Sequence, residues 1–304
     1  VLWSESELWP NLLCAVKARA IPAVLLNARM SQKSFRSWRR FNGLAQAVLG
    51  AFVCCLAQNE AEAARLRVLG AKDVRISANL KYAAPPLPDN EAARIEVAIA
   101  IGNRPCLLWA STHPGEEDIA AGLQRDLSAT VKDLLTVIVP RHPVRGAEIA
   151  QQLTAQGFKV VRRSEGRLPE VPSEIYLADT LGELGVFFRL CPLVVMGGTF
   201  APIGGHNPIE PAQFGAAIFC GPSMHNFLSI EREFISRGAL LRAADEKELH
   251  ALLLRSLQDP AVAQAAGRAA RDWVQQQGEV IGEIYEALSP WLPVTKQKEG
   301  QAAA

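Results

Sequence analysis

The sequence predicts an α/β protein built from two doubly wound parallel-sheet domains, the first of which is incomplete. Short β-branched or leucine-rich runs alternate with helical patterns throughout the chain. This alternation is typical of parallel sheets joined by right-handed crossover connections. The Pro-rich stretch "LKYAAPPLPDN" at 80–90 has no period and predicts a linker. Only three strand-like runs with crossover helices precede it, fewer than a doubly wound domain contains.

The first domain is assigned from short apolar runs at the front of the chain. Strands are expected at 22–29, 51–58 and 74–79, with helices at 31–41 and 59–70 between them. The second helix ends at Gly70, the residue type most common just past a helix C-terminus. We therefore expect residues 1–80 to be the remnant of one domain and residues 81–100 to form the linker.

The second domain is expected at 101–290. Strand-like and helical runs alternate there often enough for a complete domain. Strands are expected at 105–111, 134–140, 158–163, 174–179, 192–198 and 216–222, and helices at 112–127, 141–157, 180–190 and 225–237. Residues 291–304 end in the polar run "KQKEGQAAA", which predicts a disordered tail.

Composition excludes several classes of protein. Of the 304 residues, 49% are apolar and 21% are charged, as in ordinary globular proteins, and no apolar run approaches the roughly 20 residues that cross a bilayer. Six cysteines occur without CxxC spacing, which favours a reducing, cytoplasmic compartment. The chain opens on Val1 and not on Met, so we expect a fragment or a processed form.

The front of the chain is basic, with 11 Lys and Arg against 5 Asp and Glu in residues 1–78. This surplus fits a phosphate-bearing partner, either an anionic lipid or a nucleic acid, although a solvated surface is the simpler interpretation. Phe35, Trp38 and Phe41 follow i, i+3, i+6 spacing. The basic residues around them are Lys33, Arg36, Arg39 and Arg40. The pattern predicts either a core-packed aromatic stripe or an interfacial helix beside anionic lipid.

Polar side chains follow the predicted strands of the second domain. Ligands of open parallel sheets bind outside the carboxyl ends of the strands, so we expect these side chains to converge on one edge. They are Thr112, His113, Glu116, Glu117, Arg141, His142, Thr180, Glu183, Thr199, Gly204, Gly205, His206, Asn207 and Glu210.

The segment "MGGTFAPIGGHNPIEPAQFG" at 196–215 carries the strongest signal for a binding site. Its glycines, Gly198 and Gly205 among them, would let backbone N–H groups approach a phosphate at a helix N-terminus. Thr199 and His206 lie beside these glycines in the sequence. Glu210 could accept hydrogen bonds from a ribose diol. Arg141 has no apolar role and is expected to contact a phosphate or a carboxylate.

Some of these residues have structural interpretations as well. Thr180-x-x-Glu183 and Asn207-x-x-Glu210 both fit a capping box, and Pro208 stands where helices favour proline. For Thr180 the two interpretations remain equally open, whereas a cap does not account for the glycines before Asn207. In "SESELWPN", Glu5 and Glu7 are candidates for a general base or for a cap on the helix near Trp9.

No metal or ATP site is predicted. The sequence contains no GxxxxGK[ST], GxGxxG or HExxH motif, and Glu116-Glu117-Asp118 is only a weak substitute for the carboxylate pair that holds a metal under a diphosphate. We expect a helix terminus and Arg141 to stabilise a departing phosphate without a metal.

Together these residues resemble the 3-deoxy-D-manno-octulosonic acid (Kdo) transferases of lipopolysaccharide synthesis. The resemblance runs in order along nearly the whole chain through "SESELWPNLL", "IPAVLLNARMSQKSFRSWRRF", "ANLKYA", "VPRHP", "ADTLGELG" and "GGTFAPIGGHNPIEPAQFG". It implies a GT-B fold with two Rossmann-like domains, and transfer of Kdo from CMP-Kdo to the lipid A precursor, lipid IVA. It also implies no cofactor besides this donor, no nucleic acid, and an anionic membrane surface as a partner.

The resemblance further implies which residues hold CMP. They are Pro140, Arg141, Leu181, Gly182, Glu183, Asn207, Pro208, Ile209 and Glu210. The resemblance therefore implies that the Thr180–Glu183 turn contacts the ligand. The enzyme would be inverting and metal-independent, at the cytoplasmic face of the inner membrane of a Gram-negative cell.

The sequence departs from the family at its front. The family's usual catalytic Glu lies in a Gly-rich N-terminal loop that this sequence lacks, together with the N-terminal membrane anchor. Glu5 and Glu7 would then assist catalysis, the main base would lie outside this chain, and the chain alone should bind nucleotide without catalysing transfer. The alternatives are a GT-B transferase that uses another nucleotide sugar, such as a UDP-sugar, and a truncated nucleotide-binding module without turnover.

Overall fold

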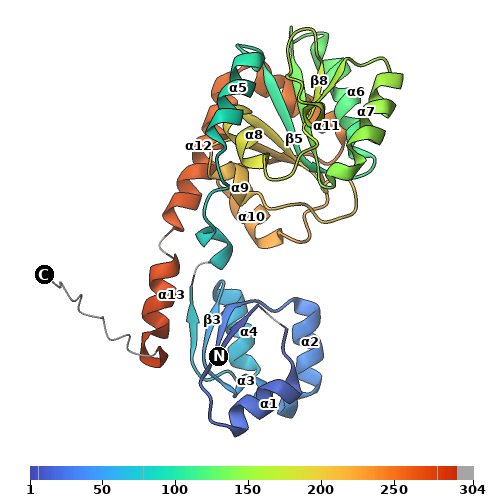
Figure 1. Ribbon diagram of the computed structural model, residues 1–304. Helices are drawn as coiled ribbons and strands as arrows, with labels where there is room; N and C mark the ends of the chain where they lie inside the picture. Colours follow the sequence, from blue (N-terminus) through green and yellow to red (C-terminus); the bar gives the residue numbers. More distant parts are fainter. Residues whose placement is uncertain (6, 78, 279, 293–304) are drawn as a thin grey trace, which may run out of the picture. The chain divides into compact units, whose positions relative to one another are not determined.

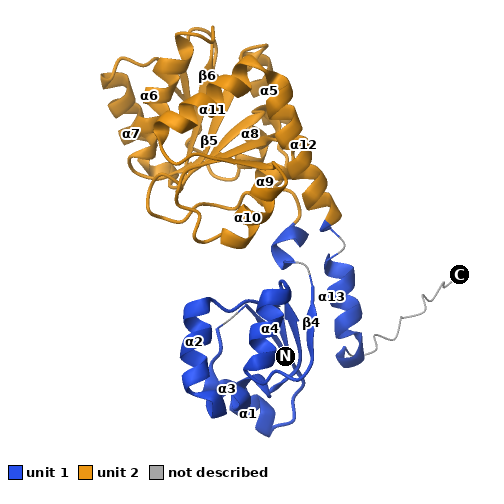
Figure 2. Cartoon of the chain, turned by 180° about the vertical axis from the view of Figure 1, so that it is seen from behind, with its two compact units in different colours: residues 1–84, 277–304 blue, residues 85–276 orange. Residues whose placement is uncertain are grey.

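The structure is a computed structural model that describes residues 1–5, 7–77, 79–278 and 280–292. The chain forms two compact units, residues 1–84 with 277–304 (unit 1) and residues 85–276 (unit 2), coloured separately in Figure 2. Each unit has its own parallel β-sheet, drawn with its helices in Figure 1. The prediction of two α/β parallel-sheet domains is confirmed.

The sheet of unit 1 has four parallel strands in sequence order. The strands are β1 (Leu2–Ser4), β2 (Ala23–Ala28), β3 (Phe52–Ala57) and β4 (Val74–Ile76), and the helices between them are α1 (Pro10–Ala18), α2 (Gln32–Arg40), α3 (Asn42–Leu49) and α4 (Glu60–Val68). One face of the sheet packs against these helices around Leu25, Leu49 and Leu66. Gly70 follows α4 with a φ of 99°, which confirms the predicted helix stop.

The other face of this sheet is covered by a helix from the far end of the chain. In α13 (Val280–Leu288), the side chains of Val280, Ile284 and Leu288 recur every four residues and pack against β2 and β3. The 3₁₀ helices η1 (Leu80–Ala83) and η4 (Ser289–Trp291) border the same cluster. The C-terminal helix therefore completes the core of unit 1.

This contact corrects the predicted domain boundaries. The predicted second domain, 101–290, includes α13, but the apolar face of this helix is buried in unit 1. Half of the expected linker 81–100 belongs to a helix of unit 2, α5 (Glu91–Ile101). This helix is capped by Asn90, whose side chain accepts from the Ala93 N–H at 3.1 Å. Of the expected disordered tail 291–304, Trp291 and Leu292 pack against unit 1, and residues 293–304 lie outside the described part.

The sheet of unit 2 has seven parallel strands in the order β11-β10-β9-β5-β6-β8-β7. They are β5 (Cys106–Thr112), β6 (Leu135–Pro140), β7 (Val160–Arg162), β8 (Ile175–Leu177), β9 (Leu193–Met196), β10 (Ala217–Cys220) and β11 (Leu240–Arg242). The connecting helices are α6 (Glu116–Ser128), η2 (Pro143–Arg145), α7 (Gly146–Ala155), η3 (Arg163–Glu165), α8 (Leu184–Leu190), α9 (Ile209–Ala212), α10 (Leu228–Ser236), α11 (Glu246–Gln258) and α12 (Pro260–Gln276).

Strand order in unit 2 places the site. Apart from β7 at the edge, the order β8-β6-β5-β9-β10-β11 is the 3-2-1-4-5-6 order of dinucleotide-binding sheets. The chain reverses direction across the sheet between β5 and β9, which are paired through Trp109 and Val195. Loops on either side of such a reversal diverge and leave a crevice at the carboxyl ends of the strands. The segments after β5, β6 and β9 therefore define the candidate site.

Candidate functional site

Side chains from these three segments meet at the carboxyl edge of unit 2. His113, after β5, and His206, after β9, stack with ring centroids 5.1 Å apart, and their Nε2 atoms are hydrogen-bonded at 2.9 Å. His142, after β6, meets the His113 ring edge-on at 6.2 Å. Arg141 precedes it, and its backbone N–H donates to the Thr112 carbonyl at 3.0 Å. The predicted convergence of these polar residues within unit 2 is confirmed.

The pKa of His206 is lowered to about 4. Burial is the main cause, and the positive potentials of His113, Arg141 and His142 add to it. The pKa of His113 is also lowered, again mainly by burial. Both imidazoles are therefore neutral at pH 7, and Arg141 supplies the fixed positive charge beside them.

Two glycines after β9 are required by close approach and by backbone conformation. A Cβ on Gly197 would lie 2.1 Å from the Ser111 carbonyl oxygen on the neighbouring strand. Gly198 has a φ of 69°, in the left-handed region. Its carbonyl accepts from the N–H groups of Gly204 and Gly205 at 3.1 and 2.8 Å. These contacts fold the segment 197–205 back on itself just before His206.

The N–H groups expected to bind a phosphate at this turn are already occupied. The buried carboxylate of Glu116 accepts from the N–H groups of Gly198 and Thr199 at 2.7 and 3.0 Å. Thr199 is itself fully buried, and its hydroxyl donates to the Met196 carbonyl and accepts from Gly221. The amides of Gly198 and Thr199, which were expected to approach a phosphate, therefore serve a side chain from α6.

Asn207 and Glu210 form a local pair at the start of α9. The Asn207 carboxamide donates to the Glu210 carboxylate at 3.3 Å and accepts from the Ile209 N–H at 3.2 Å. Burial raises the pKa of Glu210, against the opposing effects of Asn207 and Arg141. Pro208 and Ile209 are buried beneath them.

The expected capping box at Asn207 is not formed. Pro208 occupies the N-cap position of α9, which contains only four residues. A helix of one turn has a small dipole, so the expected stabilisation of a phosphate by this terminus is weaker than in a longer helix. The positive charge of Arg141 becomes correspondingly more important.

The turn after β8 lies on the same edge of the sheet but is engaged in an ion pair. The Glu183 carboxylate accepts from the Arg163 guanidinium at 2.9 Å and from the Thr180 hydroxyl. The contact with Arg163 is the main cause of the lowered pKa of Glu183. Of the two interpretations left open for Thr180, the capping box is wrong, because α8 begins at Leu184 and Glu183 is its N-cap. Leu181 is 84% exposed, and Gly182 beside it has a φ of 82°.

The acidic run at the start of α6 is hydrogen-bonded to protein partners. Glu117 accepts from Arg145 and from the Thr112 hydroxyl, both at 2.8 Å. Asp118 accepts from the carboxamides of Gln152 and Gln156 at 2.7 and 2.8 Å. Within the described residues no group of three or more His, Cys, Asp or Glu could hold a metal ion.

In unit 1, Glu5 directly follows β1 at its carboxyl end. Its N–H donates to the Leu26 carbonyl at 3.0 Å, and its φ is 60°. Glu7 is exposed, and its carbonyl accepts from the Trp3 indole at 2.7 Å. The N-cap of α1 is Trp9, without a side-chain cap, so neither carboxylate caps this helix. Ser6 between them lies outside the described residues.

The aromatic stripe of α2 is divided between core and surface. Phe35 and Trp38 pack against the core of unit 1. Phe41, at the C-cap of α2, is 64% exposed. The surrounding basic residues are exposed, namely Lys33, Arg36, Arg39 and Arg40. The core-packed interpretation therefore holds for two aromatic residues, and the third lies among exposed cations.

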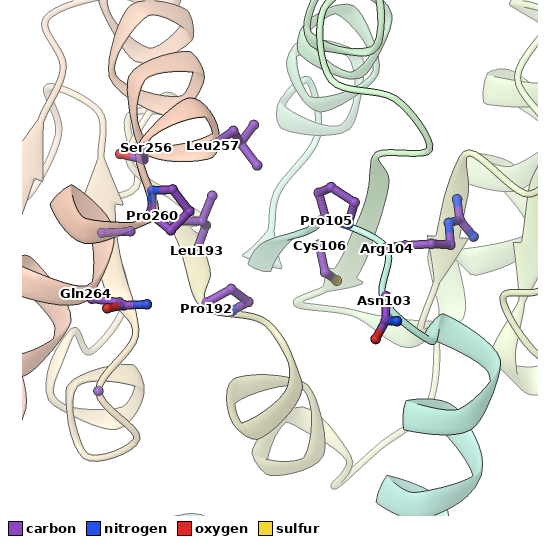
Figure 3. Close-up of a pocket in the computed structure, with 12 residues that line it drawn as sticks. Asn103, Arg104, Pro105, Cys106, Pro192, Leu193, Ser256, Leu257, Pro260 and Gln264 are labelled. Carbon is purple, nitrogen blue, oxygen red and sulfur yellow. The ribbon is translucent and has the colours of Figure 1, made fainter.

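A cavity of about 320 Å³ lies at the opposite edge of the unit 2 sheet (Figure 3). It is lined by residues at the amino ends of β5 and β9, among them Cys106 and Leu193, and by Pro260 at the start of α12. Since ligands of such sheets bind at the carboxyl ends, this cavity is separate from the candidate site. No helix in the described ranges is long and apolar enough to span a bilayer.

Known proteins resemble this chain in sequence and in fold. Residues 1–84 match the family "3-Deoxy-D-manno-octulosonic-acid transferase (kdotransferase)". A 3-deoxy-D-manno-octulosonic acid transferase of Bordetella pertussis is 34% identical over 296 residues, which cover 96% of this chain and 69% of that protein. The corresponding protein of Rickettsia bellii is 30% identical and is covered to 70%.

Solved structures resemble the fold as well. The C-terminal CMP-Kdo binding domain of WaaA from Acinetobacter baumannii matches 61% of this chain with 29% identity, a TM-score of 0.57 and 97% coverage of that domain. Anabaena HepE in complex with UDP matches 95% of this chain and 78% of its own length, with 16% identity and a TM-score of 0.54, which indicates a shared fold.

Two Rossmann-like α/β units of this kind give the chain the GT-B fold, and its sequence relatives are glycosyltransferases. Within that class, it belongs to the 3-deoxy-D-manno-octulosonic acid transferases.

Sequence reasoning missed the contacts of two residues in the site. It placed Glu116 and His113 among the polar residues that follow a strand, but it gave neither residue a partner. Their partners are 82 and 93 residues away in sequence, so no local pattern could have shown the contacts. The only available signal was their position directly after a strand.

Proposed function

We propose that the protein transfers Kdo from CMP-Kdo to the lipid A precursor, lipid IVA, and that unit 2 binds the donor. The observation that carries this proposal is the likeness of unit 2 to a CMP-Kdo binding domain at 29% identity over 97% of that domain. The strand order of unit 2 supports a donor crevice at the carboxyl ends of β5, β6 and β9.

Donor binding is assigned to the residues around Arg141. Its exposed guanidinium meets the phosphate of CMP, where a planar donor makes strong charge-assisted hydrogen bonds. Asn207 and Glu210 accept from the ribose hydroxyls, and His206 lies beside the phosphate as a neutral hydrogen-bonding group. Pro140, Leu181 and Gly182 border the crevice, and the exposed Leu181 side chain offers an apolar surface to the base.

The proposed reaction is an inverting displacement. A carboxylate removes the proton from the acceptor hydroxyl, whose oxygen attacks the anomeric carbon of Kdo, while the bond from that carbon to the CMP phosphate breaks. Arg141 stabilises the negative charge on the departing CMP. Glu5 and Glu7 assist on the acceptor side, and another carboxylate acts as the main base.

Metal independence is part of the proposal. The carboxylates that could have held a metal near the phosphate belong to Glu116, Glu117 and Asp118, and each is bound by protein donors. The cation required in the transition state is then Arg141.

The acceptor is a lipid, so the protein must work at a membrane surface. We place unit 1 at the anionic cytoplasmic face of the inner membrane through α2, whose exposed cations surround the exposed ring of Phe41. Basic helices with an apolar residue bind such surfaces through charge and burial together.

The test of donor specificity is a calorimetric titration of the 304-residue chain with CMP, with UMP and AMP as controls. The expected result is binding of CMP at least tenfold tighter than UMP. Binding of UMP without CMP would contradict the Kdo assignment and favour a UDP-sugar. Binding of none of the three nucleotides by a folded chain would contradict a nucleotide site in unit 2.

A further inference from the structure

The buried carboxylate of Glu116 is the feature of unit 2 that the proposed donor contacts do not explain. It opens α6, is 1% exposed, and accepts five backbone N–H groups. Oε1 accepts from Thr199, Phe200 and Ala201 at 3.0, 3.0 and 3.3 Å. Oε2 accepts from His113 and Gly198 at 2.9 and 2.7 Å.

Four successive N–H groups that converge on one anion form a backbone nest, the arrangement by which proteins commonly hold phosphates. Here the anion is a side chain of the same protein. Burying a charged carboxylate is unfavourable unless hydrogen bonds replace its hydration, and the nest supplies these bonds. A second anion in the same nest would be repelled by the carboxylate at short range.

The hydrogen bonds of Glu116 connect it to His206, in the proposed donor site, in two ways. Through Gly198 it fixes the carbonyl that accepts from Gly204 and Gly205, directly before His206. Through the His113 backbone it fixes the residue whose ring bonds to His206 at 2.9 Å. One carboxylate therefore holds both the chain that leads into His206 and the backbone of the residue whose ring contacts His206.

We propose that Glu116 is a positioning residue for donor binding, a built-in anion that shapes the loop after β9. The donor phosphate then meets Arg141 and the segment 204–210, and not the N–H groups of 198–201. This inference rests on the proposed function of unit 2 as the CMP-Kdo site.

The first test needs no variant. Amide NMR spectra of the isotopically labelled chain are compared with and without CMP. The amides of 198–201 should be protected from exchange in the free protein and should change little with CMP, while the amides of 204–210 shift and gain protection. If CMP perturbs 198–201 as strongly as 204–210, the inference is overturned.

The second test compares Glu116→Gln with Glu117→Gln, which alters the neighbouring buried carboxylate that pairs with Arg145 instead of the loop. Glu116→Gln should weaken CMP binding at least tenfold and raise exchange of the 198–201 amides at least tenfold. Glu117→Gln should change both by less than twofold, and Glu116→Asp should restore part of the affinity.

A purely structural role for Glu116 predicts a different result. Glu116→Gln and Glu117→Gln would then both lose thermal stability, while the folded Glu116→Gln protein would bind CMP within twofold of the wild type. This outcome also overturns the inference. If Glu116→Gln does not fold, the wild-type amide comparison decides. A wild type that does not bind CMP contradicts the proposed function, whereas CMP binding that perturbs 198–201 contradicts only this inference.

Discussion

At the scale of single residues, the substitution of Glu210 is the most direct test of the proposed donor site. Its carboxylate accepts from Asn207 and, in the proposed donor site, also accepts from the ribose diol. Glu210→Ala should weaken CMP binding at least tenfold, about 1.4 kcal/mol, in calorimetric titration. Glu148→Ala, which alters an exposed carboxylate in the first turn of α7, is the control and should bind like the wild type. Unchanged affinity of Glu210→Ala would remove this residue from the site.

His206 gives the site a predictable dependence of stability on pH. Its pKa is about 4 in the folded protein and about 6.5 when unfolded, so between these values the unfolded state binds more protons. The contribution of His206 to stability is therefore present above pH 6.5 and is lost as the pH falls toward 4. In urea unfolding, the free energy of unfolding of the His206→Asn variant should fall less between pH 7 and pH 4 than that of the wild type. Equal losses would show that His206 is not buried as described.

At the scale of elements, α13 offers a test of the correction to the domain boundaries. Ile284 is 7% exposed against the sheet of unit 1, while Ile281 on the same helix is 59% exposed. Ile284→Ala should destabilise unit 1 by about 2–4 kcal/mol, since it leaves a cavity in the core. Ile281→Ala should cost less than about 0.5 kcal/mol. Similar losses in urea unfolding for the two variants would contradict the packing of α13 on this sheet.

The basic helix α2 carries the membrane prediction. Reversing Arg36, Arg39 and Arg40 to Glu should reduce binding to vesicles that contain anionic lipid at least tenfold, because each cation near such a surface contributes about 1 kcal/mol. Arg232→Glu, on the exposed face of α10, should have little effect. Sedimentation with vesicles at low and high salt measures both, and binding unaffected by the α2 charges would exclude this helix as the contact.

At the scale of the whole molecule, unit 2 is expected to act as a separate donor-binding module. Its sheet, its core and all proposed nucleotide contacts lie within residues 85–276. A fragment of residues 85–276 should therefore unfold cooperatively and bind CMP within about twofold of the full chain, an affinity difference of about 0.4 kcal/mol. A folded fragment without CMP affinity would show that unit 1 contributes to the donor site.

Much of this architecture could be predicted because local patterns carry it. Alternating apolar runs and helical periods predicted the parallel sheets, and glycine at 70 marked a helix end, since these features depend on neighbouring residues. Polar residues after strands predicted the edge at which His206, Arg141 and Glu210 lie, because parallel strands all end on one side. The motif "GGHNPIE" and its companions indicated the family.

Only the tertiary structure decided which groups remain free for a ligand. The sequence could not show that Glu116 accepts hydrogen bonds from the N–H groups of Gly198 and Thr199. It also could not show that Arg163 forms an ion pair with Glu183, or that α13 packs against the sheet of unit 1. Each of these contacts joins residues far apart in the chain, where spacing carries no information about proximity. The sequence by itself determined the fold class and the edge of the sheet where the candidate site lies. The folded chain determined which donors and acceptors on that edge are already hydrogen-bonded within the protein.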